Sequence, residues 1–334
     1  MAKEAPGLMP ETTARFAASW HAVAPPGKVG LAVSGGPDSL ALLLLAHEVA
    51  PRNFHVVTVD HGLRPESADE AEMVARLCAQ RGIPHATLTL SLAKGSAVQE
   101  RARHARYAAM AQWALEAGLV ALVTAHHADD QAETMLMRLN RGAGLRGLAG
   151  MRSVAPLPCP PDIRLPLLRP LLDWRRSDLA QVVEQAGVCA ADDPSNRDHF
   201  YERVRIRAAM TSINSFDAKA FATSASNLAE ADAALEWATD VLWKDVARDA
   251  EGFTWNAPPD VPKALALRVL ERMLAASGAP FPRGPELARW LETLHAGGVS
   301  TLGGIKGDAR AGPWRFTRAP ERRPDLRDRS PKNG

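Results

Sequence analysis

The sequence is poor in cysteine, with three in 334 residues: Cys78, Cys159 and Cys189. They are odd in number and far apart, which argues against a disulfide scaffold or a paired-cysteine metal site and favours a reducing compartment. No apolar run approaches the length of a membrane span; the longest is LALLLLA at 40–46. The start of the chain lacks a basic stretch followed by an apolar core, so we expect no secretory leader and a cytoplasmic location.

The chain also lacks a strong net charge, which is +2 at pH 7. The total therefore says little about partners. The distribution says more, because FYERVRIR at 200–207 and the segment 306–332 concentrate Lys and Arg, a pattern that favours contact with a polyanion. For the segment 306–332, an ordinary solvated surface is the alternative.

Strand and helix signals alternate through the first half of the chain. Short apolar runs typical of strands occur at 28–33, 54–60, 85–90 and 119–125, and a fifth is expected near 164–168. Helical periodicity predicts helices at 39–50, 67–82, 97–117, 129–139 and 175–187. This alternation predicts an α/β fold with a parallel, Rossmann-like sheet covered by helices on both faces.

After about residue 215 the pattern becomes helical. Amphipathic stretches predict three helices, within 226–243, 263–276 and 285–295. WRFTR at 314–318 alternates like a short strand. We therefore predict an α/β domain over 1–215, a smaller, mostly α-helical domain over 216–320, and a disordered tail over 321–334.

A glycine-rich turn, SGGPDS at 34–39, separates the first strand from the helix that follows it. Glycines allow a sharp bend and let backbone N–H groups face an anion, and the helix N-terminus adds positive charge at the same place. The turn lacks the lysine of the common P-loop. Because Asp38 would repel a phosphate, the loop predicts a phosphate site that contains Mg²⁺. A tight turn capped by serine and aspartate is the alternative.

A second polar segment, AHHADDQAET at 125–134, begins at the end of the fourth strand. His126 could donate a hydrogen bond to phosphate, whereas Asp130 and Glu133 share a helix face and could hold a cationic amine. An acidic helix cap is the alternative, and the spacing does not resemble that of a zinc site. The glycines at 142–150 predict a flexible loop suited to closing over a substrate.

The two polar segments and a third, VDHGLRPES at 59–67, all follow predicted strands. Ligands of parallel sheets bind beyond the carboxyl ends of the strands. We therefore expect all three segments to converge on one crevice.

SGGPDS resembles the SGGxDS signature of the N-type ATP pyrophosphatases, the PP-loop superfamily. With the remaining motifs, the chain resembles the tRNA(Ile)-lysidine synthetase family almost continuously over 28–207. These motifs are VDHGLR (59–64), ERARHARY (100–107), AHHADDQAET, RGAGLRGLAGM (141–151), RPLL (169–172), and DPSN followed by RVRIR (193–207). The end of the chain resembles the family's shorter members, without the larger C-terminal extension of the longer ones.

The resemblance implies a ligase that uses ATP and Mg²⁺. ATP would adenylate the position-2 oxygen of the wobble cytidine in the CAU anticodon of tRNA(Ile). The ε-amine of free L-lysine would then attack C2 and displace AMP. The product, lysidine, pairs with A and changes the specificity of the tRNA from methionine to isoleucine. We expect no membrane partner, and the oligomeric state stays open between a monomer and a homodimer.

The resemblance also implies roles for individual residues. The ATP site would comprise Ser34, Gly35, Gly36, Pro37, Asp38, Ser39, His61 and Arg64, with Asp38 toward Mg²⁺ and His126 on the α-phosphate. Arg106, Asp130 and Glu133 would bind lysine, and Asp130 is the natural base for its amine. Arg203 and Arg207 would contact tRNA, in a protein whose helical domain also binds it. A solvated helix start is the alternative for RVRIR.

Two other functions are compatible with part of this pattern. A PP-loop tRNA thiolase would use the same adenylation, but its closest counterparts carry paired cysteines for an iron–sulfur cluster, and this chain has none. A non-catalytic nucleotide-binding protein would need the glycine loop but not the segment 125–134.

Overall fold

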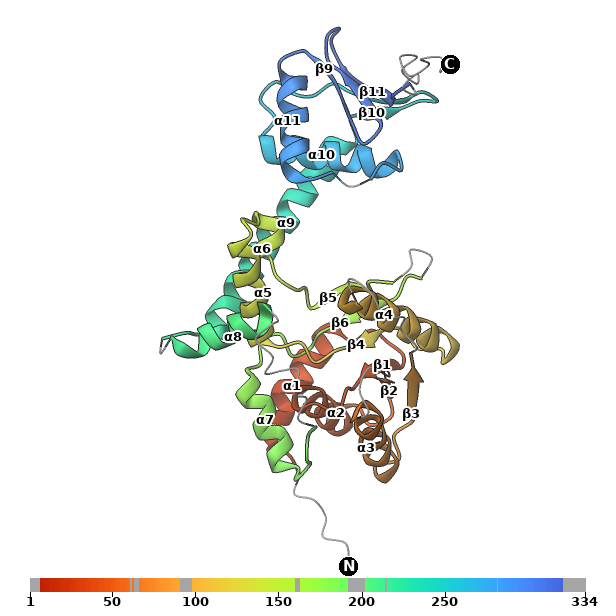
Figure 1. The fold of residues 1–334 in the computed structure, drawn as a ribbon, viewed down its shortest axis with the longest axis vertical. Coiled ribbons are helices and arrows are strands. Elements are labelled where there is room, and N and C mark those ends of the chain that lie inside the picture. Colours follow the sequence, from red (N-terminus) through yellow and green to blue (C-terminus); the bar gives the residue numbers. More distant parts are fainter. Residues whose placement is uncertain are drawn as a thin grey trace, which may run out of the picture. The chain divides into compact units, whose positions relative to one another are not determined.

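The computed structural model describes residues 7–60, 62, 66–90, 98–159, 163–191, 202–213, 215–280 and 282–320. The chain divides into two compact units, Met1–Ala229 and Glu230–Gly334, with the division inside the long helix α9 (Ala218–Trp243) (Figure 1). The tail predicted to be disordered, 321–334, lies outside the described residues. None of the helices in the described ranges is long and apolar enough to cross a membrane.

The first unit contains a six-stranded sheet in the order β3-β2-β1-β4-β6-β5. Its strands are β1 (Val29–Ala32), β2 (Phe54–Asp60), β3 (His85–Thr89), β4 (Leu122–Val123), β5 (Val154–Pro156) and β6 (Pro166–Leu168). All neighbours pair in parallel except β5, which runs antiparallel to β6 at the edge. The predicted parallel α/β sheet is confirmed, and the short edge strand β5 is an addition to it.

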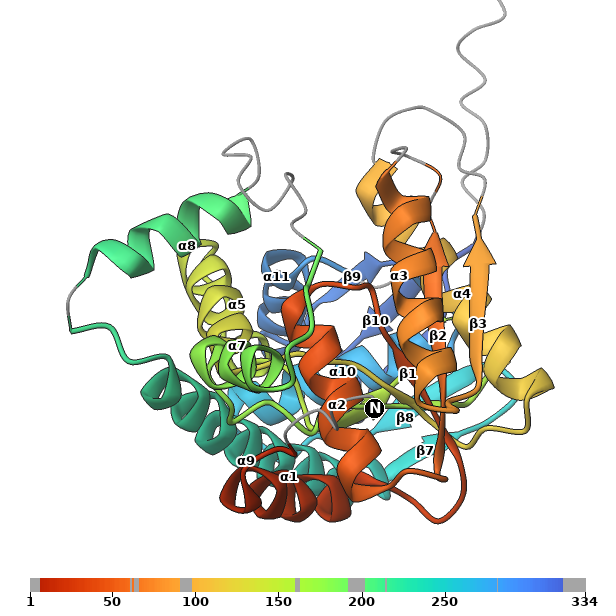
Figure 2. The same cartoon turned by 90° about the horizontal axis from the view of Figure 1, so that it is seen from below.

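Helices cover both faces of this sheet: α1 (Pro10–Val23), α2 (Pro37–Val49), α3 (Glu66–Gln80), α4 (Val98–Glu116) and α7 (Arg176–Gln185). The helices α5 (Ala128–Asn140), α6 (Leu145–Leu148) and α8 (Glu202–Ser212) belong to neither core of the sheet, and α5 and α8 pack with the start of α9 in a separate cluster. Side chains of α1, α2, α3 and α7 form one core with the sheet, whereas α4 forms a separate core on the other face (Figure 2). Gly30 of β1 permits the approach of α4, because a Cβ there would lie 2.6 Å from the Trp113 ring.

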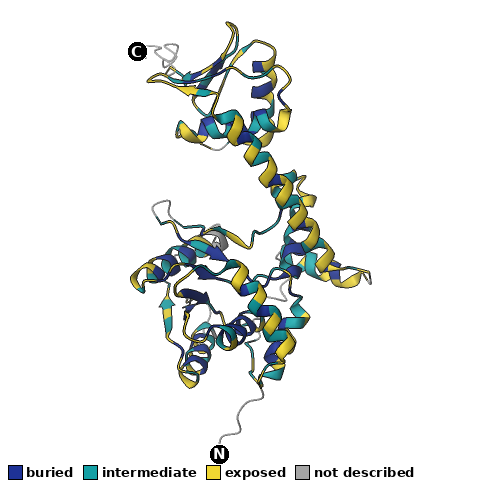
Figure 3. Ribbon diagram, turned by 180° about the vertical axis from the view of Figure 1, so that it is seen from behind, coloured by how far each residue is buried: buried dark blue, intermediate teal, exposed yellow. Residues whose placement is uncertain are grey.

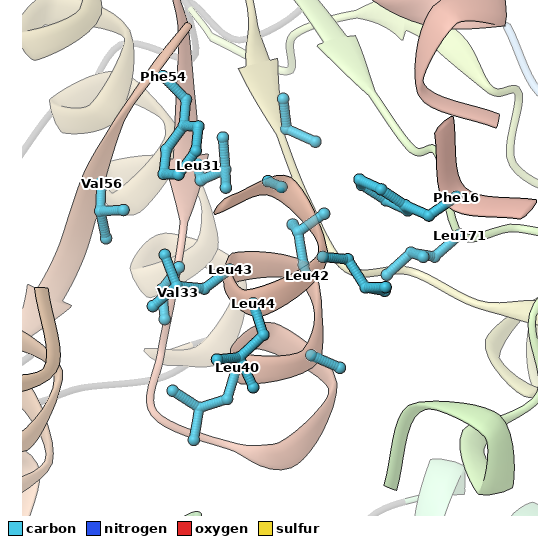
Figure 4. Packing of buried hydrophobic residues seen from close by; sticks show 14 of the residues in the cluster. Phe16, Leu31, Val33, Leu40, Leu42, Leu43, Leu44, Phe54, Val56 and Leu171 are labelled. Carbon is cyan, nitrogen blue, oxygen red and sulfur yellow. The ribbon is translucent and has the colours of Figure 1, made fainter. Parts of the chain in front are cut away.

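The leucine run 40–46 forms the centre of α2 and is buried on every side. Its side chains contact Leu31 and Val33 of the β1 segment, and Phe16 and Leu171 belong to the same core (Figure 4). Burying one leucine contributes about 1.5–3 kcal/mol, so this helix fixes the position of the glycine turn that precedes it.

The second unit has an antiparallel sheet in the order β7-β8-β11-β10-β9. Its elements are the end of α9, β7 (Val246–Arg248), β8 (Gly252–Trp255), α10 (Lys263–Ala276), α11 (Gly284–His295), β9 (Val299–Leu302), β10 (Ile305–Asp308) and β11 (Trp314–Arg318). One face of the sheet packs against α10 and α11 through Trp255, Trp314 and Phe316. In Figure 3, which colours the ribbon by burial, dark blue stretches in the helices and strands of this unit mark buried residues, and yellow stretches mark exposed ones. The sequence predicted the three helices and β11, but not β7–β10.

Candidate active site

The strand order places a switch point between β1 and β4. The chain runs outward from β1 to β2 and β3, and then returns to add β4 and β6 on the other side of β1. Connections leave the carboxyl ends of β1 and β4 in opposite directions, which opens a crevice there for a ligand. The glycine turn 34–39 follows β1, and the segment 125–134 follows β4, so both lie at this crevice.

Hydrogen bonds of its two serines stabilise the conformation of the glycine turn. The Ser34 N–H donates to Ser39 Oγ (3.1 Å), and Ser39 Oγ–H donates to the Gly36 carbonyl (2.9 Å). Gly35 has a φ of 88°, a left-handed conformation that glycine adopts readily. Helix α2 begins at Pro37, and its first N–H groups face the crevice end of the turn. This arrangement of donors suits a phosphate group.

His127 joins the two segments. Its side chain is buried, and its Nε2 lies 3.4 Å from Asp38 Oδ2 and 3.5 Å from Asp130 Oδ2. Its Nδ1 lies 3.6 Å from Asp129 Oδ2. Burial alone would lower the pKa of His127, but Asp129 and Asp38, with Asp130, raise it to about 9. The imidazole is therefore charged at neutral pH and balances carboxylates from both segments. Neither His127 nor Asp129 was among the predicted site residues.

His126 has the opposite electrostatic character. Burial lowers its pKa to about 4, although Asp130 opposes this shift. Its Nδ1 lies 2.8 Å from Thr124 Oγ1. In the tautomer in which Nδ1 accepts from that hydroxyl, the neutral ring keeps one N–H, at Nε2, for donation to a ligand.

Glu133 is the most enclosed acidic group of the segment, with a fully buried side chain. It accepts hydrogen bonds from Arg203 Nε (2.6 Å), Arg207 Nε (2.7 Å) and Arg176 Nη2 (3.3 Å). Arg203 Nη2 also donates to Asp130 Oδ1 (3.3 Å). Burial would lower the pKa of Arg207, but Glu133 raises it. The structure thus brings Asp130 and Glu133, predicted for lysine, together with Arg203 and Arg207, predicted for tRNA, in one ion-pair cluster that joins α5, α7 and α8.

Arg106 of α4 lies apart from that cluster. Its guanidinium carbon is 5.5 Å from the centre of the Tyr107 ring, and its Nε is buried without a hydrogen-bond partner. Within the described residues, no contact joins it to Asp130 or Glu133. His61 and Arg64 lie outside the described residues, whereas Gly62 between them donates its N–H to Asp60 Oδ1 (2.9 Å).

The segment 141–151, for which the sequence predicted a flexible loop, contains the short helix α6, and hydrogen bonds join its C-terminal side to α5. The Gln131 amide donates to the Met151 carbonyl (2.8 Å) and accepts from its N–H (2.7 Å). Arg138 Nη1 donates to the Gly147 carbonyl (2.6 Å). Gly150 has a φ of 63°, and a Cβ there would lie 2.6 Å from Gln131 Oε1. The glycines therefore permit a tight packing against α5.

A magnesium ion would have one suitable oxygen beside the glycine turn. Asp38 Oδ1 is buried without a hydrogen-bond partner, which fits a group that binds a cation. Within the described ranges, no group of three or more His, Cys, Asp or Glu side chains could hold a metal ion by itself. One carboxylate together with phosphate oxygens is a common way for proteins to bind Mg²⁺.

Comparison with known proteins shows which family the sequence matches. A family model described as the PP-loop domain matches residues 10–213. The tRNA(Ile)-lysidine synthase of Novosphingobium aromaticivorans is 64% identical over 94% of this chain and 95% of its own length. That of Zymomonas mobilis is 42% identical over 89% of this chain and 90% of its own.

The comparison with solved structures supports the fold alone. The U34-tRNA thiolase NcsA of Methanococcus maripaludis, solved with its 4Fe-4S cluster, has a TM-score of 0.53 and 17% identity. The match covers 66% of this chain and 78% of the thiolase.

Proposed function

The chain belongs to the tRNA(Ile)-lysidine synthase family of PP-loop proteins, and we propose on this basis that it joins lysine to the wobble cytidine of a tRNA(Ile) with a CAU anticodon. The observation that carries the proposal is the contact between Asp38 and His127, which unites the phosphate-binding turn with the histidine segment. A nucleotide-binding protein without catalysis would need the turn but not this second segment.

In the first step, the position-2 oxygen of the cytidine attacks the α-phosphate of ATP, and pyrophosphate leaves. Residues 34–39 hold the departing pyrophosphate through backbone N–H groups and serine hydroxyls. Asp38, together with the phosphates, would hold Mg²⁺, which would supply positive charge to offset that of the leaving group. The neutral His126 donates from Nε2 to the α-phosphate, where negative charge develops.

In the second step, the ε-amine of lysine attacks C2 and the C–O bond to AMP breaks. The amine must first lose a proton, and Asp130 at the start of α5 is the proposed acceptor. Glu133 can take part in lysine binding only by exchanging one of its arginines. Arg203 is the most exposed of the three, at 41% of its side chain, and it also contacts Asp130. We propose that the lysine ammonium takes the position of the Arg203 guanidinium beside Asp130 and Glu133. Arg203 can then bind an RNA phosphate, with Arg207 beside it.

The test is mass analysis of the nucleosides of a CAU-anticodon tRNA(Ile) after incubation with ATP, Mg²⁺ and lysine. We expect lysidine with all components, and pyrophosphate release that requires tRNA. Asp38→Asn should abolish pyrophosphate release while changing the melting temperature little, because Asp38 is partly exposed beside the turn. An Asp38→Asn enzyme with full activity would remove Asp38 from the reaction.

The same assay separates the two other functions. Incorporation of sulfur, with no lysidine, would identify a thiolase. That outcome is disfavoured because the nearest two cysteines in the sequence, Cys159 and Cys189, are 30 residues apart. ATP binding without pyrophosphate release, in the presence of both tRNA and lysine, would identify a non-catalytic nucleotide-binding protein.

A further inference from the structure

Helix α7 and its two flanks connect the two halves of the candidate active site. We refer to residues 173–191, which comprise α7 and these flanks, as the α7 segment. Leu179, Val182 and Val183 of α7 belong to the same core as the leucine run of α2, and the two helices pack against each other. The α7 segment is thus anchored on the helix that begins in the glycine turn.

The N-terminal end of the α7 segment is hydrogen-bonded to the histidine segment. The Ala128 N–H, at the start of α5, donates to the Trp174 carbonyl (2.8 Å). The Arg176 N–H donates to Asp129 Oδ2 (2.8 Å), and the same carboxylate oxygen lies 3.6 Å from His127 Nδ1. The main chain of the α7 segment therefore fixes the two residues that follow His127 in the sequence.

The C-terminal end of the α7 segment contacts the glycine turn. The Ala191 N–H donates to the Gly35 carbonyl (3.0 Å). Because the C=O and the N–H of a trans peptide point in opposite directions, this bond turns the Gly36 N–H away from the α7 segment. Within the described residues, that N–H has no hydrogen-bond partner. The bond from Ala191 thus orients the Gly36 N–H as a donor for a phosphate group.

Arg15 of α1 fixes the N-terminal end of the α7 segment. Its Nη1 donates to Asp178 Oδ2 (2.9 Å), and its Nη2 donates to the Asp173 carbonyl (2.9 Å). Its guanidinium carbon lies 4.0 Å from the centre of the ring of Trp174, which is buried. Asp178 also accepts from the Arg175 N–H (3.2 Å), at the first turn of α7. One guanidinium group thus holds the residue whose carbonyl binds the start of α5.

We propose that the α7 segment sets the spacing between the glycine turn and the histidine segment, and that Arg15 and Ala191 are the residues that position it at its two ends. The inference rests on the proposed function for the reaction concerned, and it adds positioning residues that no step of that reaction uses. Adenylation requires the turn that holds pyrophosphate and the His126 that contacts the α-phosphate in one alignment. An error of about 1 Å in such an alignment can cost about 100-fold in rate.

The first test measures pyrophosphate release by the full-length protein with ATP, lysine and a CAU-anticodon tRNA(Ile). Arg15→Gln should lower kcat roughly 10- to 100-fold and leave the KM for ATP unchanged, because the glycine turn keeps its bond to Ala191. Arg15→Lys keeps a charge beside Asp178 and should recover part of the loss. Asp178→Asn should resemble Arg15→Gln. The double variant should be no slower than the slower single variant, because both changes break the same contact.

The second test measures the Kd of ATP by calorimetry. Ala191→Pro removes the N–H that binds Gly35 and should raise the Kd roughly tenfold, a loss in the lower range for one hydrogen bond to a charged group. Ala191→Gly keeps the N–H and should bind ATP more tightly than Ala191→Pro. Arg76→Gln breaks an exposed ion pair with Glu72 on α3 and should change neither kcat nor the Kd of ATP.

The proposal is overturned if kcat of Arg15→Gln, per folded protein, equals that of the wild type, because the Arg15 contacts would then serve stability alone. An unchanged Kd of ATP in Ala191→Pro would overturn it at the glycine turn. The Arg15 variants decide the proposal even if Ala191→Pro does not fold. If the wild-type protein releases no pyrophosphate, the proposed function fails. The ATP affinities of the Ala191 variants, and hydrogen exchange of the Ala128 amide, which Arg15→Gln should accelerate, still test the α7 segment.

Discussion

Replacing Glu133 with glutamine should weaken the attachment of helix α8 to helix α5. The change keeps the shape of the side chain but removes the charge that three arginines share. Glu133 is fully buried, and its contacts to Arg203 and Arg207 are short, at 2.6 and 2.7 Å. Removing one partner of a buried ion pair costs about 3–5 kcal/mol. A native domain is stable by only about 5–15 kcal/mol, so this loss is a large fraction of the total.

Native-state amide hydrogen exchange measures this cost locally. We expect the amides of α8 to exchange about two to three and a half orders of magnitude faster in Glu133→Gln, at about 1.4 kcal/mol per tenfold. The amides of α2 should change much less, because that helix is buried in a separate core. Arg207→Gln leaves two arginines on Glu133 and should cost less, about 1–3 kcal/mol.

A matched control is the ion pair between Arg315 and Glu251 in the second unit, in which both side chains are more than half exposed. Arg315→Gln should cost about 0–1 kcal/mol, as surface pairs do. The reasoning is refuted if α8 exchanges within tenfold of the wild-type rate in Glu133→Gln. In that case the arginine contacts would not be what holds α8 in place.

Three further outcomes are expected. His126 and His127 should together give the free energy of unfolding a maximum near pH 6.5, the ordinary pKa of histidine. The stabilisation from His127, whose pKa is raised to about 9, is complete below pH 6.5 and is lost as the pH rises through about 9. His126, whose pKa is lowered to about 4, destabilises the fold increasingly as the pH falls from 6.5 through about 4. Urea midpoints across that range would show this, and His127→Gln should flatten the alkaline side. Gly150→Ala should lower the free energy of unfolding, measured by urea denaturation, by roughly 1–2 kcal/mol more than Gly142→Ala does. Both glycines have a positive φ, but only at Gly150 would the new Cβ clash with a side chain, that of Gln131, which two hydrogen bonds hold in place. A chain ending at Ala229 should keep ATP binding but bind tRNA more weakly and with a flatter salt dependence, and unchanged filter-binding curves would leave the second unit without a role in tRNA binding.

The elements that the sequence predicted well have a strong periodic signal. The strand predicted at 54–60 and the helix predicted at 263–276 match β2 and α10 at both ends. The missed strands β5, β7, β8, β9 and β10 have only three or four residues each, too few for an alternating pattern to stand out from a turn. They form through pairing with strands far along the chain or next to them in a hairpin, which local periodicity does not report.

The candidate site was likewise predictable from the sequence only in part. Parallel strands end at one edge of a sheet, and this rule correctly brought the glycine turn and the histidine segment together. In the third segment, at 59–67, residues 61 and 63–65 lie outside the described residues. The partners of Glu133 were not predictable, because they come from α7 and α8, whose packing on α5 depends on tertiary contacts.

The structure also answers a difficulty that the sequence raised, namely an aspartate inside an anion-binding turn. Asp38 does not face the phosphates as an isolated charge, because one of its oxygens lies 3.4 Å from the protonated His127. Asp129 is balanced by the same imidazole and by Arg175, and Asp130 by His127 and Arg203. The carboxylates at the crevice are thus compensated from within the protein before a substrate arrives. In the proposed mechanism, the Asp38 oxygen that has no hydrogen-bond partner would bind a cation that enters with ATP, and the N-terminus of α2 would face the phosphates.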